Sequence, residues 1–229
     1  MKRLLLAAMG LAALLGPAAF AADMPPGRYM PPPRAPAYVP FFSWSGFYVG
    51  FNAGYGFGTS NWTNSTAGLS SGDFDVSGAL VGGTIGYNMQ LGSWVFGVEG
   101  DIAWSGLKGS TTSAVCLGTC TTENSWLGTA RGRIGYAFDR FLPYFTGGAA
   151  FGDIKASNSL GSTSFTSAQV GWTAGGGLEY AFYANWSAKV EYLYVDLGKA
   201  GCDTVCIFAS PSDVSLKANV VRAGLNYKF

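Results

Sequence analysis

Eight charged residues stand among small and polar neighbours and could act together. They are Glu99, Asp101, Arg131, Arg133, Glu179, Lys189, Glu191 and Arg222. Two carboxylates at positions i and i+2, such as Glu99 and Asp101, point to one side of an extended strand and could serve as general acid and base. Because arginines with the same spacing stand on a neighbouring predicted strand, we expect a buried ion network instead, with no catalytic residue.

Other motifs give no sign of an enzyme. The chain contains no histidine, the most frequent general base in enzymes. Glycine runs at Gly82-Gly83 and Gly175-Gly176-Gly177 lie inside strand-like segments and precede no predicted helix, so close packing explains them better than phosphate binding. We therefore expect no cofactor.

The four cysteines form two C-x-x-x-C pairs, Cys116 with Cys120 and Cys202 with Cys206. Such a pair can bind a metal, but a chain without histidine that is exported to an oxidising compartment favours disulfides. Four cysteines allow three connectivities, and bridges within or between the two segments both stay open.

The N-terminus reads as an export signal. Lys2 and Arg3 precede an apolar run, and a small-residue cleavage site, Ala19-Phe20-Ala21, follows it, so residues 1–21 are predicted to be a signal peptide. Seven prolines follow within residues 22–43, which we interpret as an extended periplasmic linker. The barrel described next is expected to occupy residues 44–229.

Composition indicates a surface that meets lipid. Only 12% of the residues are charged, about half the usual share of a soluble domain, and the near balance of charge argues against a nucleic-acid partner. Beyond residue 44, large apolar residues alternate with small or polar ones. The alternating segments are 47–57, 79–90, 94–104, 126–138, 142–152, 169–182, 186–194 and 221–229.

Eight alternating segments predict an all-β fold, an eight-stranded antiparallel up-and-down transmembrane β-barrel. Short connections near residues 91–93, 139–141 and 183–185 alternate with long ones near 59–75, 105–124, 153–167 and 197–215. Short turns on the periplasmic side and long loops outside are typical of outer-membrane barrels. Aromatic residues beside the short turns are expected to form one membrane girdle, with a second formed by Trp104, Trp126 and Tyr194.

The charged residues are expected inside this barrel, because a basic side chain facing mid-membrane lipid costs about 2–4 kcal/mol. The short turn at 183–185 predicts that Glu179 faces Lys189. If Trp94 and Phe138 share one interface, Glu99 lies near Arg133 and Asp101 near Arg131. An eight-stranded barrel is filled by its side chains, so we expect a packed lumen without an open channel.

The final strand carries an insertion signal. Leu225 and Tyr227 alternate toward the terminal Phe229, a pattern that resembles the strand recognised by the barrel-assembly machinery of the outer membrane.

Several motifs together resemble a known family. They are Trp44-Ser45-Gly46-Phe47-Tyr48-Val49-Gly50, Arg131-Gly132-Arg133-Ile134-Gly135-Tyr136-Ala137, Leu142-Pro143-Tyr144 and the ending Gly224-Leu225-Asn226-Tyr227-Lys228-Phe229. The chain resembles the RopB-type small outer-membrane proteins of alphaproteobacteria, within the wider group similar to the OmpA transmembrane domain. The resemblance implies a location in the bacterial cell outer membrane, in contact with its lipid.

Members of that family are described as surface antigens, envelope-stabilising proteins or porins, and some relatives as haem binders. We expect a non-enzymatic structural and surface protein. The alternatives are a narrow porin-like channel and a haem- or ligand-binding receptor, and haem would need a Tyr, Met or Cys ligand here. The sequence leaves open the partner of the loops and the oligomeric state.

Overall fold

The computed structural model describes residues 42–64, 68–113, 118–158, 164–202 and 212–229, which form one antiparallel sheet closed on itself. The strands are β1 (Gly46–Asn64), β2 (Leu69–Ser70), β3 (Phe74–Leu91), β4 (Trp94–Ser113), β5 (Gly118–Tyr136), β6 (Phe141–Asn158), β7 (Ser164–Ala181), β8 (Trp186–Cys202) and β9 (Ser212–Lys228). The two-residue β2 pairs only with the end of β1, so eight strands make the wall. No helix in these ranges is long and apolar enough to cross a membrane.

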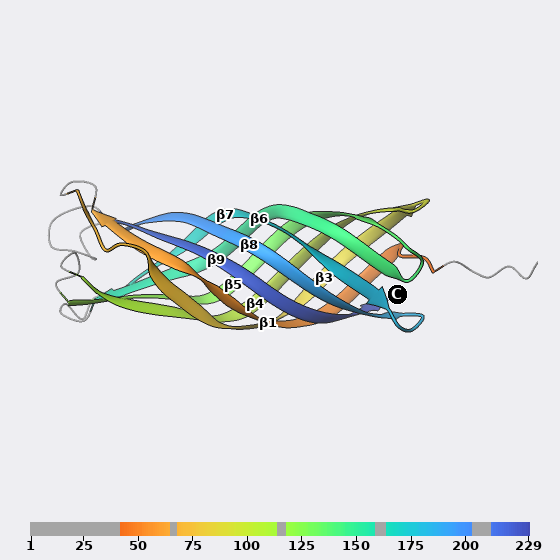
Figure 1. Cartoon of the computed structure of the whole chain (residues 1–229), viewed down its shortest axis with the longest axis horizontal. Coiled ribbons are helices and arrows are strands. Elements are labelled where there is room, and N and C mark those ends of the chain that lie inside the picture. The colour runs from red at the N-terminus through yellow and green to blue at the C-terminus, as the bar shows by residue number, and fades with distance from the viewer. Residues whose placement is uncertain (1–41, 65–67, 114–117, 159–163, 203–211) are drawn as a thin grey trace, which may run out of the picture. The chain divides into compact units, whose positions relative to one another are not determined.

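Closure joins the last strand to the first. Each wall strand pairs with its neighbour in the chain, and β9 pairs with β1 from Tyr48 opposite Lys228 to Asn64 opposite Ser212. The Phe229 amide also donates to the Phe47 carbonyl at 3.0 Å. The strands wind obliquely around a common axis (Figure 1), and the predicted eight-stranded up-and-down barrel is confirmed.

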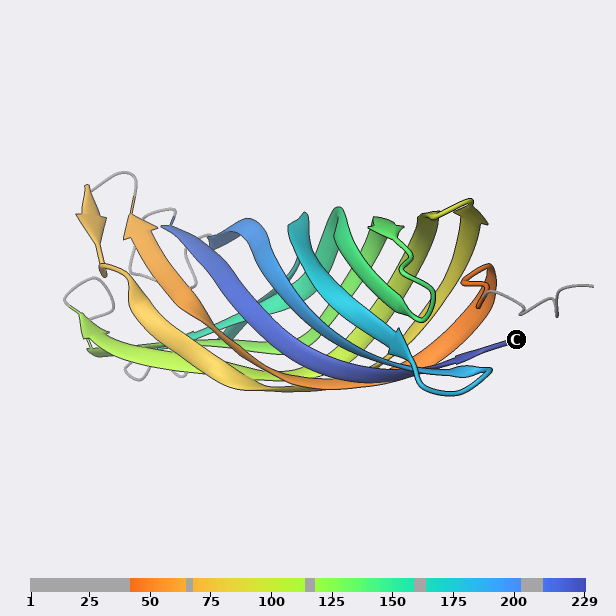
Figure 2. The ribbon, with the colours of Figure 1, turned by 45° about the vertical axis from the view of Figure 1, so that its right-hand side comes forward.

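Three tight turns gather at the end of the barrel that carries the C-terminus, which we call the turn end (Figure 2). Gly92 and Ser93 join β3 to β4, residues 137–140 join β5 to β6, and residues 182–185 join β7 to β8. Gly92 has a φ of 63° and Asp139 a φ of 56°, the left-handed region that tight hairpins need. We call the opposite end the loop end.

The outer wall is apolar around the turn end and the middle of the barrel. In β1 the outward residues Phe47, Val49, Phe51, Tyr55 and Phe57 are all at least 41% exposed. Outward positions of the other strands are similar. They include Ile85, Trp94, Val98, Ile102, Phe145, Trp172, Val190, Val221 and Leu225. Rows of exposed aromatic and aliphatic side chains on a folded surface require an apolar solvent.

The strands are much longer than the sequence pattern predicts. The wall strands contain 17 to 20 residues, whereas a tilted strand needs about 9–11 to cross a membrane. Most of the segments predicted as long loops, 59–75, 105–124, 153–167 and 197–215, continue the strands wherever they are described. That prediction was wrong because strands were recognised by bulky apolar residues on the outward face. Beyond the apolar wall the apolar residues lie on the inward face and the polar residues face outward.

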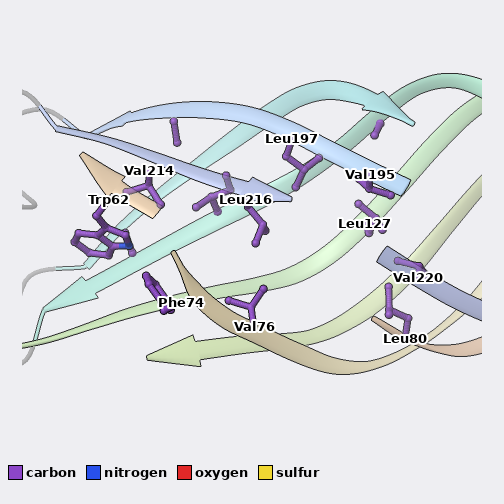
Figure 3. Close-up of a cluster of buried hydrophobic side chains, with 14 of the residues drawn as sticks. Trp62, Phe74, Val76, Leu80, Leu127, Val195, Leu197, Val214, Leu216 and Val220 are labelled. Atoms are coloured by element: carbon purple, nitrogen blue, oxygen red, sulfur yellow. The ribbon is translucent and has the colours of Figure 1, made fainter. Parts of the chain in front are cut away.

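The reversal creates a second interior of apolar side chains at the loop end, which we call the loop-end core. Its members are Trp62, Phe74, Val76, Leu80, Ala103, Cys120, Leu127, Ala150, Ile154, Ala156, Leu193, Val195, Leu197, Ala200, Val214, Leu216 and Val220. In Figure 3 side chains from β1, β3, β5, β8 and β9 converge between the strands. The expectation of a uniformly polar lumen therefore does not hold at this end of the barrel.

Two β-bulges help to set which residues face inward. The first lies near Asn124, where the register of β5 shifts against both neighbours: β4 has one extra residue between Trp104 and Leu107, and β5 has one extra residue relative to β6 between Glu123 and Leu127. The Asp153 carboxylate accepts the amides of Ser125 and Trp126 there at 2.7 and 3.1 Å. A second bulge lies in β8 between Asp196 and Lys199. A bulge moves the following residues to the other face of the sheet, so a strict two-residue alternation cannot be followed through either strand.

The segment before β1 closes the turn end. Trp44 is 2% exposed and packs with Val95, Ala137, Leu142, Tyr144 and Ala181. Its indole donates to the Asp139 carbonyl at 2.9 Å, and its amide donates to the Gln90 side chain at 2.8 Å. We call this cluster the turn-end seal.

The loop-end core makes a stability prediction. Leu216, 2% exposed, points into the core, so Leu216→Ala should lower the free energy of unfolding by about 2–5 kcal/mol. Lys217→Ala, at the neighbouring outward position, should change it by less than about 0.5 kcal/mol. Urea titration of protein refolded in detergent micelles checks both, and heat-modifiable gel migration shows that each variant is folded. Equal effects of the two substitutions would contradict the inward packing of Leu216.

Candidate functional site

All eight charged residues singled out in the sequence lie buried inside the barrel, between the turn-end seal and the loop-end core. They come from β4, β5, β7, β8 and β9, and each residue is at most 9% exposed. Four carboxylates meet four basic side chains, so their formal charges cancel. We call this cluster the ion network.

Arg131 is the centre of the ion network. Its guanidinium donates to Glu191 Oε1 and to Asp101 Oδ2, each at 2.8 Å, and also contacts Glu99. Its Nε donates to the Thr129 hydroxyl at 2.8 Å. The side chain has no exposed surface. One planar cation thus joins three carboxylates from β4 and β8, a geometry that a lysine could not reproduce.

Arg222 from β9 makes a second bridge between the same strands. It lies 2.9 Å from Asp101 Oδ1 and 2.7 Å from Glu191 Oε2. Lys189 from β8 reaches across the lumen to Glu99 at 3.0 Å, and the Tyr48 hydroxyl donates to the same carboxylate at 2.7 Å. With Arg131 from β5 and Arg222 at 3.7 Å, Glu99 is therefore held by side chains from four strands.

Arg133 forms the edge of the network nearest the turns. It pairs with Glu179 at 2.7 Å and lies 4.1 Å from the centre of the Tyr144 ring. Glu179 also accepts from Ser187 at 2.6 Å and from Asn226 at 2.8 Å. A cation over an aromatic face gains further attraction in a dry interior.

Sequence reasoning missed the two tyrosines of this cluster. Tyr48 and Tyr144 were counted only as part of motifs, yet both are 3% exposed and bind the charged groups. The alternation could have predicted the inward direction of Tyr48. Tyr48 lies between the outward residues Phe47 and Val49, and successive side chains of a strand point to opposite faces.

The registers agree with the predictions in one hairpin and differ in the other. Glu179 lies opposite Lys189, as the short turn predicts. Trp94 lies opposite Tyr136 and not Phe138, so the assumed alignment was wrong by two residues, and Glu99 stands directly opposite Arg131. The shift arises because Phe138 pairs back with Phe141 across the tight turn.

Contacts reach beyond the directly opposite residue. Arg133 still lies 3.6 Å from Glu99, and Arg131 contacts Asp101. Lys189 makes its ion pair with Glu99 across the lumen, while Glu179, its register partner, is held by Arg133. In so narrow a barrel, side chains of distant strands meet as easily as neighbours.

This arrangement leaves neither Glu99 nor Asp101, the sequence candidates for acid and base, positioned for acid–base work. Both oxygens of Glu99 and of Asp101 accept hydrogen bonds from the side chains around them. A general base must have the substrate proton within hydrogen-bond reach, and these oxygens face only other protein groups among the described residues.

The remaining candidates lie away from the ion network. Leu225 and Phe229 are exposed on the outer wall and Tyr227 is half-buried there, with its ring 5.2 Å from Trp186 and 5.3 Å from Phe229. Cys120 is buried in β5, and the backbone of Cys202 ends β8, so neither lies in a loop as predicted. Cys116 and Cys206 fall outside the described residues, and disulfide connectivity stays a prediction.

A closed antiparallel barrel with an apolar outer wall, short turns at one end and a charge-matched interior defines an integral outer-membrane β-barrel protein. Residues 35–229 match the family described as "Outer membrane protein beta-barrel domain". The chain belongs to this family, and it lies in the bacterial outer membrane.

Curated relatives narrow the group to alphaproteobacteria, which confirms the resemblance found in the sequence. The "31 kDa outer-membrane immunogenic protein" of Brucella melitensis is 39% identical, with all of both chains covered. The "22 kDa outer membrane protein" of Rhizobium leguminosarum is 32% identical, covering 83% of this chain and 80% of its own.

Among solved structures, the outer membrane protease OmpT of Escherichia coli has a TM-score of 0.53 at 10% identity, covering 80% of this chain and 97% of its own. At this identity the likeness shows the fold alone.

The ion network predicts strong coupling between Lys189 and Glu99. Lys189→Met removes a cation from buried Glu99 and should cost about 3–5 kcal/mol of unfolding free energy. Adding Glu99→Gln to Lys189→Met should recover part of that loss, whereas adding Glu179→Gln should recover less, because Glu179 is held by Arg133. Urea titration of the single and double variants checks the order. Additive losses for Lys189 and Glu99 would contradict the pairing.

Proposed function

We propose that this protein is a non-enzymatic structural and surface barrel whose lumen is closed along its length. The observation that carries the proposal is the burial of the ion network: the side chains of Arg131 and Glu191 have no exposed surface, and that of Glu99 is 2% exposed. An open channel would keep such groups in water.

Three layers of side chains support a closed lumen. The turn-end seal fills the periplasmic opening with Trp44, the ion network occupies the middle, and the loop-end core fills the outer part. A solute would have to displace all three, including ion pairs whose loss would leave uncompensated buried charge.

The names of relatives support the surface role. The Brucella proteins are named outer-membrane immunogenic proteins, and at the loop end the strands here continue past the apolar wall. We infer that the part of the strands beyond the apolar wall projects from the membrane and is exposed at the outside of the cell. Strong lateral contact with lipid together with a rigid interior suits a protein that contributes to envelope integrity.

Planar-bilayer recording tests the closed lumen. Protein refolded in detergent and shown to be folded by heat-modifiable migration should give no steady conductance steps, because no continuous water path crosses the three layers. A porin of known conductance, reconstituted in the same lipid, controls for insertion. Reproducible unitary steps from this protein would overturn the proposal in favour of a narrow channel.

The outward residues Leu225, Tyr227 and Phe229 support a role in recognition by the barrel-assembly machinery. Phe229→Asp should lower the amount of folded protein in the outer membrane several-fold, since the terminal aromatic belongs to the proposed recognition strand. Tyr183→Asp, an exposed aromatic in the β7–β8 turn, is the matched control and should leave that amount unchanged. Heat-modifiable migration of membrane fractions measures both. Wild-type levels of folded Phe229→Asp protein would contradict the role of the terminal residue.

A further inference from the structure

A polar groove of about 250 Å³ lies on the outside of the wall, over β1, β8 and β9 near the loop end. Its lining consists of Thr59, Asn61, Thr63, Asp73, Lys199, Asp213, Ser215 and Lys217. The ladders place Thr59 opposite Lys217, Asn61 opposite Ser215, and Lys199 opposite Ser215. The groove therefore crosses three adjacent strands.

The groove begins where the apolar wall ends. Outward residues that lie directly opposite one another on β1, β9 and β8 form rows across the wall. The exposed row of Tyr55, Val221 and Tyr192 is apolar or aromatic. The next row toward the loop end contains Phe57, Asn219 and Tyr194, and the row after it contains Thr59 and Lys217. From Phe47 to Phe57 the strand rises about 33 Å, and a tilt of about 40° reduces this to roughly 25 Å, the height of the apolar band in such barrels. The groove therefore lies at the headgroup level of the outer leaflet.

The bulge in β8 turns Lys199 toward this groove. Leu193, Val195 and Leu197 face the interior, and without an extra residue Lys199 would follow them into the apolar loop-end core. Instead, the chain bulges at Gly198, which has a φ of 72°. The Gly198 amide donates a hydrogen bond to the Asp196 carboxylate at 2.9 Å. Bulges commonly re-aim a side chain at a functional place.

The lining suits a ligand that is both phosphorylated and rich in hydroxyl groups. Lys199 and Lys217 supply cationic donors for phosphate. The Lys217 side chain is 54% exposed and lies 3.9 Å from Asp196, a long, solvent-exposed ion pair that contributes little stability and can be exchanged for a phosphate contact. Asp213 and Asn61 supply polar groups for sugar hydroxyls, and Asn61 is positioned by its bond to Asp73 at 2.8 Å. The small side chains of Thr59 and Ser215 leave room above the backbone.

We propose that this groove binds the phosphorylated sugar headgroup of an outer-leaflet glycolipid. The proposal goes beyond the closed-lumen function and depends only on the barrel lying in the outer membrane. Headgroup binding here would fix the rotation of the barrel relative to its lipid neighbours.

The test uses the full-length mature protein refolded in nonionic detergent and a fluorescent label on its N-terminus. The probe is purified diphosphorylated lipid A with its inner sugars, compared with the same glycolipid after enzymatic dephosphorylation. The Lys199→Ala/Lys217→Ala variant should bind the phosphorylated probe about tenfold or more weakly. High salt should weaken the wild-type affinity as well.

Lys108→Ala/Lys155→Ala is the matched control, because these outward lysines lie on β4 and β6, away from the groove, and are also partly exposed, at 65% and 43%. It should keep the wild-type affinity within about twofold. Unchanged binding by the groove variant, equal losses in both double variants, or equal affinity for the dephosphorylated probe would each overturn the proposal. Displacement by millimolar inorganic phosphate alone would assign the site to soluble phosphate and not to lipid.

Discussion

The structure depends on the requirement that charge inside a closed eight-stranded sheet must be matched by charge. The eight charged residues of the ion network are each at most 9% exposed, so bulk water cannot solvate them. Arg131 meets the requirement by joining Glu99, Asp101 and Glu191. Arg222, on β9, reaches the same three carboxylates. The same pairs that neutralise the interior therefore tie β4, β5, β8 and β9 together across it.

Strand length divides the barrel into two environments. Where the wall faces lipid, the interior contains the ion network above the turn-end seal. Past the row of Phe57 and Tyr194 the wall becomes polar and the interior apolar. The solvent around each part of the wall thus determines what the interior contains. Where the wall meets water, apolar side chains are more stable in the lumen than on the surface. The groove over β1, β8 and β9 lies on this boundary, which is why it combines lysines with hydroxyl groups.

Much of the fold could be predicted because the lipid-facing part has strict alternation and short turns. The burial of residues such as Glu99 and Lys189 followed from the cost of exposing charge to lipid. Three features could not be predicted. The loop-end core around Leu216 reverses the expected polarity, the bulges near Asn124 and Gly198 break the alternation, and the partner of Lys189 lies across the lumen, where strand order carries no information. Tyr48 was missed because the inward face was expected to carry small or polar residues, and a large aromatic side chain was assigned to neither face.

The turn-end seal also determines how the barrel would bear mechanical load. The Phe42 amide is held by the Asp139 side chain at 3.2 Å, and the Trp44 indole by the carbonyl of the same residue. Tension applied at Phe42 would therefore reach the β5–β6 turn before it reached the β1 ladder. With its ring seated among Val95, Leu142 and Tyr144, Trp44 would have to be extracted sideways through the opening. These contacts lie ahead of Gly46, where β1 begins, so they would have to break before a pull on the leading segment separated β1 from its neighbours.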